Sequence, residues 1–197
     1  HDCQDHQMGA HHVEVPERLH AISDRMIASG IEMLVTHYDA PKATREQLLR
    51  VHDAEYVDRI FDAAPTAPDV LSWVDGDTAM CNGTLNAALR AAGAATLAVD
   101  LVMTDKHHAA FCAVRPPGHH AERHAAMGFC FFNNVAVGAW HVCRRGRSFS
   151  GQHPGVPVLG RRGAGAHAGH PADRRAGRRA RRCRRRNRAG PGAARGG

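Results

Sequence analysis

The chain has 197 residues, enough for one domain with a sizeable core, and its formal net charge of +7 is distributed unevenly. Residues 1–143 contain 10 Lys and Arg against 18 Asp and Glu, a net charge of −8, whereas residues 144–197 contain 16 Arg and one acid, a net charge of +15. The total charge therefore describes neither part, which excludes an interpretation of the whole chain as a basic protein.

The six cysteines are scattered, with no CxxC pair and no secretory segment before them, which excludes the patterns of a disulfide framework and of a zinc knuckle. No apolar run approaches the roughly 18 residues that span a bilayer. We therefore expect a cytoplasmic protein without a membrane segment. Because the chain begins with His1, we also expect a few residues to be missing in front of it.

Three short helices are predicted before residue 65. In the first, Pro16 occupies the first turn, Gly30 ends the helix, and one face is apolar. The second opens with Thr44 and Gln47 at the spacing of a capping box. The third has Asp53 as its predicted cap and Pro65 after its end. The apolar faces of the first and third helices consist of Leu19, Ile22 and Met26, and of Val57, Ile60 and Phe61.

Helix, strand, loop and helix follow in that order from residue 81. Apolar residues repeat at helical spacing over 81–103, and the short apolar run 109–114 predicts a buried strand. The segment Arg115-Pro116-Pro117-Gly118 predicts a rigid loop, after which Asn134 can cap a buried helix. This order favours an α/β fold with a mainly parallel sheet, in which ligands bind at the loops that leave the strands.

Residues 144–197 differ in composition from the rest, because Arg, Gly, Ala and Pro make up 41 of their 54 residues. Such a segment buries too little apolar surface to offset its ordering entropy, so we expect a disordered basic tail. The abrupt change near residue 144 also suggests translation of a GC-rich gene in a shifted frame, which sequencing of the gene and its transcript would test.

His119 and His120 lie side by side in the predicted loop. A histidine takes and returns a proton near neutral pH, so one of the pair could activate a water while the other stabilises developing negative charge. The alternative is a histidine pair without chemistry, and the doublets at 11–12 and 107–108 show that such pairs recur in this chain.

The sequence around this doublet resembles a known family. "RPPGHHA" followed by "MGFCFFNNVAVGA" is similar to the signature of the histone deacetylase superfamily, whose members are zinc-dependent amidohydrolases that act on acetylated lysine or acetylated amines. Three upstream segments support the resemblance: "HVEVPER", with Val13 where the family has proline, "VHDAEYV" and "WVDGDTAM". The resemblance covers residues 1–143 and implies the amino-terminal part of an arginase/deacetylase-like fold.

Site roles follow from the resemblance residue by residue. It implies that His120 is the general base and later protonates the amine, and that His119 is its electrostatic partner. Gly128 and Phe129 match positions that line the acyl-lysine tunnel. Asp75 matches the rim aspartate that binds the substrate backbone, and Asp77 is an alternative match of equal weight. Zinc is the implied cofactor.

The zinc ligands of the family do not follow in this sequence. Neither the Asp-x-His segment nor the second aspartate is present after residue 143, nor is the downstream tyrosine or histidine that polarises the carbonyl. His167, His170 and Asp173 lie three residues apart, but Gly165, Gly169 and Pro171 interrupt any helix that would align them. We therefore expect no metal ligands in this chain and an incomplete, inactive site.

A second hypothesis treats residues 144–197 as a basic arm that binds nucleic acid non-specifically through counterion release. The chain would then be a non-catalytic binding protein.

Overall fold

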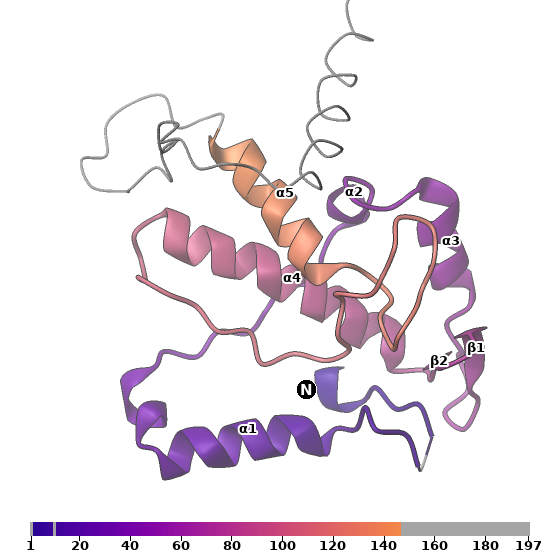
Figure 1. The fold of residues 1–197 in the computed structure, drawn as a ribbon, viewed down its shortest axis with the longest axis horizontal. Coiled ribbons are helices and arrows are strands. Elements are labelled where there is room, and N and C mark those ends of the chain that lie inside the picture. The colour runs from indigo at the N-terminus through magenta and orange to yellow at the C-terminus, as the bar shows by residue number, and fades with distance from the viewer. Residues whose placement is uncertain (1, 10, 147–197) are drawn as a thin grey trace, which may run out of the picture. The chain divides into compact units, whose positions relative to one another are not determined.

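The computed structural model describes residues 2–9 and 11–146, which belong to one compact unit. In chain order its elements are η1 (Asp2–Gln4), α1 (Glu17–Ala28), η2 (Ile31–Leu34), α2 (Arg45–Leu48), α3 (Ala54–Asp62), β1 (Ser72–Asp75), β2 (Thr78–Met80), α4 (Thr84–Met103) and α5 (Asn134–Gly146) (Figure 1). Helix α5 continues past the predicted domain end at residue 143. The predicted disorder of residues 147–197 lies outside the described residues.

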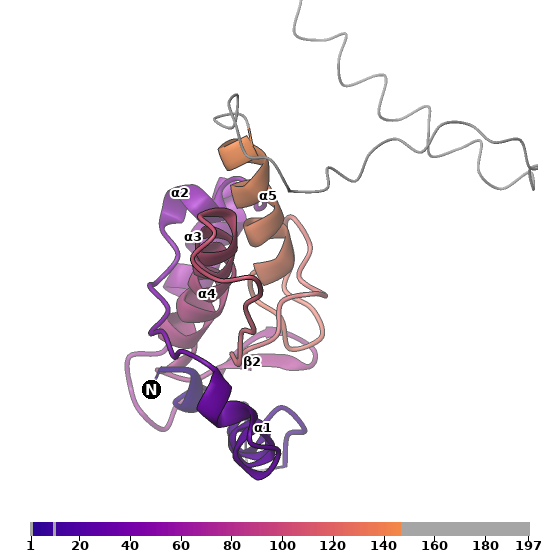
Figure 2. The same ribbon diagram turned by 90° about the vertical axis from the view of Figure 1, so that its left-hand side faces the viewer.

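Helix α1 begins after Pro16, and the chain turns at Gly30, whose φ is 72°, as the sequence predicts. Its apolar face is half-buried, and α1 contains no fully buried residue. Helix α1 packs mainly against η2, and both views show it apart from the pair α4 and α5 (Figure 1, Figure 2). This helix therefore contributes little to the core.

Helices α2 and α3 confirm the local signals in the sequence only in part. Thr44 and Gln47 form both hydrogen bonds of the predicted capping box. Asp53 occupies the N-cap position of α3, but its side chain makes no cap bond and instead pairs with Arg123 at 2.6 Å. On the predicted apolar face of α3, Val57 and Ile60 are buried, whereas Phe61 is 36% exposed.

The sheet differs from the prediction. Strands β1 and β2 form an antiparallel hairpin with a bulge between Trp73 and Asp75, and no parallel pair occurs within residues 2–9 and 11–146. The predicted strand 109–114 is an irregular segment, in which Phe111 is 72% exposed. A strand requires a neighbour for its ladder hydrogen bonds, and none of the described segments pairs with this one. The apolar composition of residues 109–114 gives no information on whether such a neighbour is present.

Helices α4 and α5 pack against each other, as both views show (Figure 1, Figure 2). Gly138 of α5 permits this approach, because a Cβ there would lie 3.3 Å from the Ala95 side chain. The predicted cap is displaced by one residue, since Asn133 Oδ1 accepts from Ala136 N at 3.0 Å. Helix α5 is also less buried than predicted: Val135 and Trp140 are exposed.

One helix has the length and composition of a membrane span, although no uninterrupted apolar run of that length occurs in the sequence. Helix α4 has 20 residues and a mean hydropathy of 1.3 in its 18-residue window. Half of that window is buried inside the structure, a property that it shares with the core helices of globular proteins.

The core lies where α2, α3, β2, α4 and α5 meet the loop before α5. Its largest members are aromatic and aliphatic side chains that are almost fully buried: Tyr56, Phe131, Phe132, Leu48 and Met80. Tyr56 Oη also donates to the Phe131 carbonyl at 2.6 Å, and burial raises the pKa of Tyr56. The core therefore holds the loop that contains the candidate site.

Candidate functional site

The tandem histidines lie on an exposed turn directly after a buried anchor. Arg115 and Gly118 are buried, whereas His119 and His120 are exposed, with ring centroids 4.3 Å apart. A Cβ at Gly118 would lie 2.4 Å from the Phe132 carbonyl oxygen and 2.6 Å from Asn134 N. Only glycine fits there, so the histidine loop lies tightly against the start of α5.

The Gly128-Phe129 turn contacts this loop. An ideal Cβ on Gly128 would lie 2.9 Å from His120 Cδ2, so the glycine allows the imidazole to approach the backbone. Gly128 and Phe129 have φ of 55° and 68°, and Met127 and Cys130 exchange backbone hydrogen bonds across the turn. Two consecutive residues with positive φ are typical of a tight I′ turn. The structure thus brings His119, His120 and Gly128 together, with Phe129 next to Gly128 in the turn.

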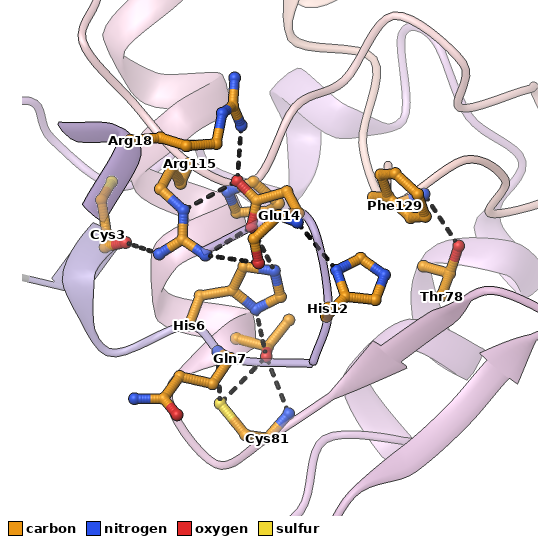
Figure 3. Close-up of polar contacts among 12 residues, drawn as sticks. Cys3, His6, Gln7, His12, Glu14, Arg18, Thr78, Cys81, Arg115 and Phe129 are labelled. Atoms are coloured by element: carbon orange, nitrogen blue, oxygen red, sulfur yellow. Dashed lines mark hydrogen bonds and ion pairs between the residues drawn. The ribbon is translucent and has the colours of Figure 1, made fainter. Parts of the chain in front are cut away.

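Phe129 is held from two sides. Its backbone N donates to Thr78 Oγ1 of β2 at 3.0 Å. Its ring meets the edge of the His12 ring, with centroids 4.5 Å apart and an interplanar angle of 85° (Figure 3). These contacts hold a bulky residue in left-handed backbone, a conformation that costs about 1–2 kcal/mol.

A buried polar cluster beneath the histidine loop was not predicted. Arg115 Nε donates to Glu14 Oε1 at 2.8 Å, Arg115 Nη2 reaches Glu14 Oε2, and Arg115 Nη1 donates to the Cys3 carbonyl at 3.0 Å (Figure 3). Both side chains of the ion pair are at most 2% exposed. Glu14 Oε1 also accepts from Arg18 Nη1 at 2.8 Å. The carboxylate of Glu14 therefore links the amino-terminal segment to the histidine loop.

His6 lies against the same carboxylate. Its Nδ1 is 2.8 Å from Thr84 Oγ1, while its buried Nε2 has no hydrogen-bond partner and lies 3.5 Å from Glu14 Oε2. Burial, and then the positive charges of Arg115 and His12, lower the pKa of His6 to about 3. His6 is therefore neutral at neutral pH, and the arginines neutralise Glu14.

Sequence reasoning singled out neither this cluster nor the contact of His12 with Phe129. Glu14 and Arg115 are 101 residues apart, so no local periodicity connects them. The signal that was available was their presence in the two most specific motifs, "HVEVPER" and "RPPGHHA".

Asp75 is not part of the group around the histidines. This exposed residue lines a pocket of about 330 Å³, and the residues that line the pocket include neither histidine, nor Gly128, nor Phe129. Asp77 accepts a hydrogen bond from Thr78 Oγ1 at 2.7 Å, and Thr78 binds Phe129 N. By these contacts Asp77 is connected to the site more closely than Asp75 is.

The described residues do not fit a zinc ion. Within residues 2–9 and 11–146, no group of three or more His, Cys, Asp or Glu side chains is arranged to hold a metal. His167, His170 and Asp173 lie outside the described residues. The part of the site described here can exchange protons through two exposed imidazoles, but it contains no group of ligands for a Lewis acid.

Comparisons with known proteins agree with the motifs. Residues 12–150 match the family described as the histone deacetylase domain. Human polyamine deacetylase HDAC10 is 39% identical over 133 residues, which cover 66% of this chain and 20% of that protein. A histone deacetylase-like amidohydrolase of Pseudomonas aeruginosa is 36% identical over 128 residues, with coverage of 65% and 33%.

A solved structure supports the same assignment at the level of the fold. The crystal structure of the HDA15 HD domain has a TM-score of 0.67 and 31% sequence identity, and the match covers 74% of this chain and 43% of that one. The chain spans a third or less of the two curated relatives above. Since the family match extends over more than half of its residues, the chain belongs to the histone deacetylase superfamily.

Proposed function

We propose that the described residues supply the acid/base histidines and part of the substrate channel of a zinc-dependent deacetylase that hydrolyses N-acetyl amides. The observation that carries this proposal is the contact of His120 with the Gly128-Phe129 turn, beside His119. It joins a proton-transfer pair to a glycine and an aromatic ring, the residue types that a narrow acyl-amine channel requires. All four residues lie inside the matched range.

The two histidines can carry the proton transfer and the charge stabilisation of amide hydrolysis. His120 takes a proton from water as the water oxygen bonds to the amide carbon. The C–N bond then breaks, and His120 returns that proton to the departing amine, so that the first products are acetic acid and the free amine. The acid then gives its own proton to the amine, which leaves acetate and an ammonium ion. His119 stabilises the negative charge that develops on the carbonyl oxygen. Zinc, when bound in a complete domain, supplies polarisation of that carbonyl.

Acetylated amines are the substrate class that we propose, with acetyl-lysine and acetylated polyamines as its two members to test. The name of the human relative, a polyamine deacetylase, supports the second. We assign Gly128 and Phe129 to substrate binding, and Asp75 as a rim residue. The cysteine pattern further leads us to propose a cytoplasmic location.

We also propose that the chain as written does not turn over substrate, because the described residues hold no metal-ligand group. The test is metal analysis of the purified full chain, together with hydrolysis of an acetyl-lysine reporter and of an acetylated polyamine, with and without a chelator. The expected result is neither stoichiometric zinc nor activity. Zinc with chelator-sensitive turnover would contradict the proposed inactivity.

The acid/base role has its own test. Residues 12–146 can replace the matching segment of the Pseudomonas amidohydrolase, and the activity of this chimera can then be compared with that of its variants. His120→Ala and His119→Ala are expected to abolish most of the turnover. His108→Ala is the matched control, because His108 is an exposed histidine of another doublet. If the His120→Ala chimera keeps the turnover of the unsubstituted chimera, the assignment is wrong.

A second candidate function is non-specific binding of nucleic acid by residues 144–197, favoured by their net charge of +15. Retention of the chain on a DNA column, and its loss as salt rises, would test it. A chain shortened to residues 1–146 is the control. If it is retained as strongly as the full chain, the arginines beyond residue 146 do not carry the binding. We retain residues 1–143 as the proposed extent of the deacetylase part, and a shifted reading frame after it as the proposed origin of the basic segment.

A further inference from the structure

We infer that His12 and Glu14 together position the two halves of the candidate site: Glu14 holds the histidine loop through Arg115, and His12 holds the aromatic wall at Phe129. The inference rests on the proposed function, because it assigns these residues as positioning residues for His119, His120 and Phe129. Figure 3 shows the two contacts on either side of the segment 12–14.

Arg115 anchors one end of the histidine loop. Its guanidinium makes two hydrogen bonds to the Glu14 carboxylate, one to the Cys3 carbonyl and one to the Glu14 carbonyl at 3.3 Å. A guanidinium forked onto a carboxylate has little rotational freedom. Burial excludes water that could replace any of these bonds. Arg115 therefore fixes one end of the loop in direction as well as in place.

The connection from Arg115 to the histidines is short and stiff. Pro116 and Pro117 have restricted φ, and Gly118 is packed against the Phe132 carbonyl oxygen and Asn134 N. A displacement of the Arg115 anchor therefore reaches His119 and His120 without a flexible residue to absorb it. The position of the Glu14 carboxylate thus determines the position of the imidazoles.

His12 is held in a defined orientation beside Phe129. Its Nδ1 accepts a hydrogen bond from Glu14 N at 3.0 Å, which places the ring proton of the neutral form on Nε2 and fixes the rotation of the ring. In this orientation His12 meets Phe129 edge to face. The backbone of Phe129 is in the left-handed region. The contact with His12 holds the Phe129 ring in place and thereby keeps the backbone in this unfavourable conformation.

The two contacts start from one short segment, one from His12 and one from Glu14. Residues 12–14 span two peptide units, and the Glu14 backbone supplies both the N–H that orients His12 and a carbonyl that accepts from Arg115. The segment therefore sets the separation between the proton-transfer pair and the aromatic wall. Arg18 also binds Glu14, but from the solvent side with its own side chain 53% exposed, and no bond connects Arg18 with the histidine loop in the part of the chain that the structure describes.

The experiment uses the full chain and a readout that does not depend on turnover. The ring proton resonances of His119 and His120 are assigned by NMR with the variants His119→Ala and His120→Ala. They are then followed in Glu14→Gln and Arg115→Lys, with Arg18→Ala as the matched control. Glu14→Gln and Arg115→Lys are expected to shift or broaden both histidine signals. Arg18→Ala, which also removes an ion pair from Glu14, is expected to leave them in place.

His12→Ala tests the other contact and keeps the inference falsifiable if Glu14→Gln does not fold. It removes a half-buried ring and is expected to shift the Phe129 ring signals while the histidine signals keep their positions. Unchanged His119 and His120 signals in a folded Glu14→Gln chain, or unchanged Phe129 signals in His12→Ala, would overturn the inference. Loss of the acid/base role in the chimera would instead refute the proposed function and leave these signals unaffected.

Discussion

Two neighbouring segments of the chain lack helices and paired strands over most of their length, yet they differ in how they are held. Segment 107–114 makes few contacts: Phe111 is 72% exposed, and Cys112 reaches the Ala94 carbonyl only at 3.5 Å. Segment 115–133 contains buried Arg115, Phe131 and Phe132. Both have irregular backbone. The first is held at its start by a hydrogen bond between Tyr38 and His107 at 2.7 Å, whereas the second is fixed by buried side chains.

The difference shows which interactions order the candidate site. Buried anchors in 115–133 take the role that ladder hydrogen bonds have in a sheet: an ion pair at one end, aromatic rings at the other, and a backbone turn between them. The apolar residues of 107–114 have no such anchor among the described residues. From composition alone, segment 107–114 would be expected to be the more firmly held of the two, because it is the more uniformly apolar.

The largest effect is expected from the anchor itself. Arg115→Met should lower the free energy of unfolding by about 3–5 kcal/mol, because it leaves the buried Glu14 carboxylate with only Arg18 as an ionic partner. Chemical denaturation measures this loss. Arg45→Met, at the exposed ion pair with Asp58, should cost less than about 1 kcal/mol. Equal losses in the two variants would show that the buried pair does not anchor the segment.

His6 beneath the anchor predicts a dependence of stability on pH. The folded-state pKa of His6 is about 3, and its unfolded value is 6.5, so below pH 6.5 the unfolded chain gains a proton that the folded chain does not. Stability is therefore complete above pH 6.5 and falls by about 2 kcal/mol on acidification to about pH 5. Denaturation curves across this range provide the measurement.

His6→Asn is the control for that prediction. It removes the titrating ring and should reduce the slope of stability against pH. Some slope should remain, because burial also lowers the pKa of His52. An identical slope in the variant and the parent would refute the role of His6.

A smaller effect on stability is expected at the carboxyl end of segment 115–133. Asn133 accepts from Ala136 N and donates to the Ala121 carbonyl at 3.0 Å, so it caps α5 and closes the loop at once. Asn133→Ala should destabilise the chain by about 1 kcal/mol. Asn134→Ala is the matched control, since the side chain of Asn134 makes only a 3.4 Å contact to the Pro116 carbonyl. A greater loss of stability in Asn134→Ala than in Asn133→Ala would show that Asn134, the residue that the sequence favoured, caps the helix.

The smallest effect is expected in the other segment. Phe111→Ser should change the free energy of unfolding by no more than about 0.5 kcal/mol, because the ring is already mostly in solvent. Amide hydrogen exchange should likewise be faster at 109–114 than at 130–133. A loss of several kcal/mol on Phe111→Ser would show that this segment is buried in solution.

The parts of this molecule that the sequence predicts well are those with local causes. The capping box at Thr44 and Gln47 and the turn at Gly30 depend on residues a few positions apart, and the structure has both. The group of His120 with Gly128 could be predicted only through the family signature, since seven residues of irregular loop separate them.

The parts that could not be predicted depend on distant partners. Whether 109–114 forms a strand depends on a neighbour elsewhere in the chain, and periodicity does not report one. The ion pair of Glu14 and Arg115 joins residues 101 positions apart, so it becomes visible only after folding. The cap at Asn133 was missed for a smaller reason, because two adjacent asparagines offer the same chemistry one residue apart.

The left-handed backbone of Phe129 has a consequence for anyone who engineers this protein. Gly or Asn at this position would relieve the unfavourable φ and thereby raise thermal stability, but either would delete the ring that faces His12. A library selected for heat resistance would therefore enrich such replacements. The proposed function predicts that a library selected for hydrolysis in a complete domain would reject them. Selection for thermostability and selection for turnover would thus favour different residues at position 129.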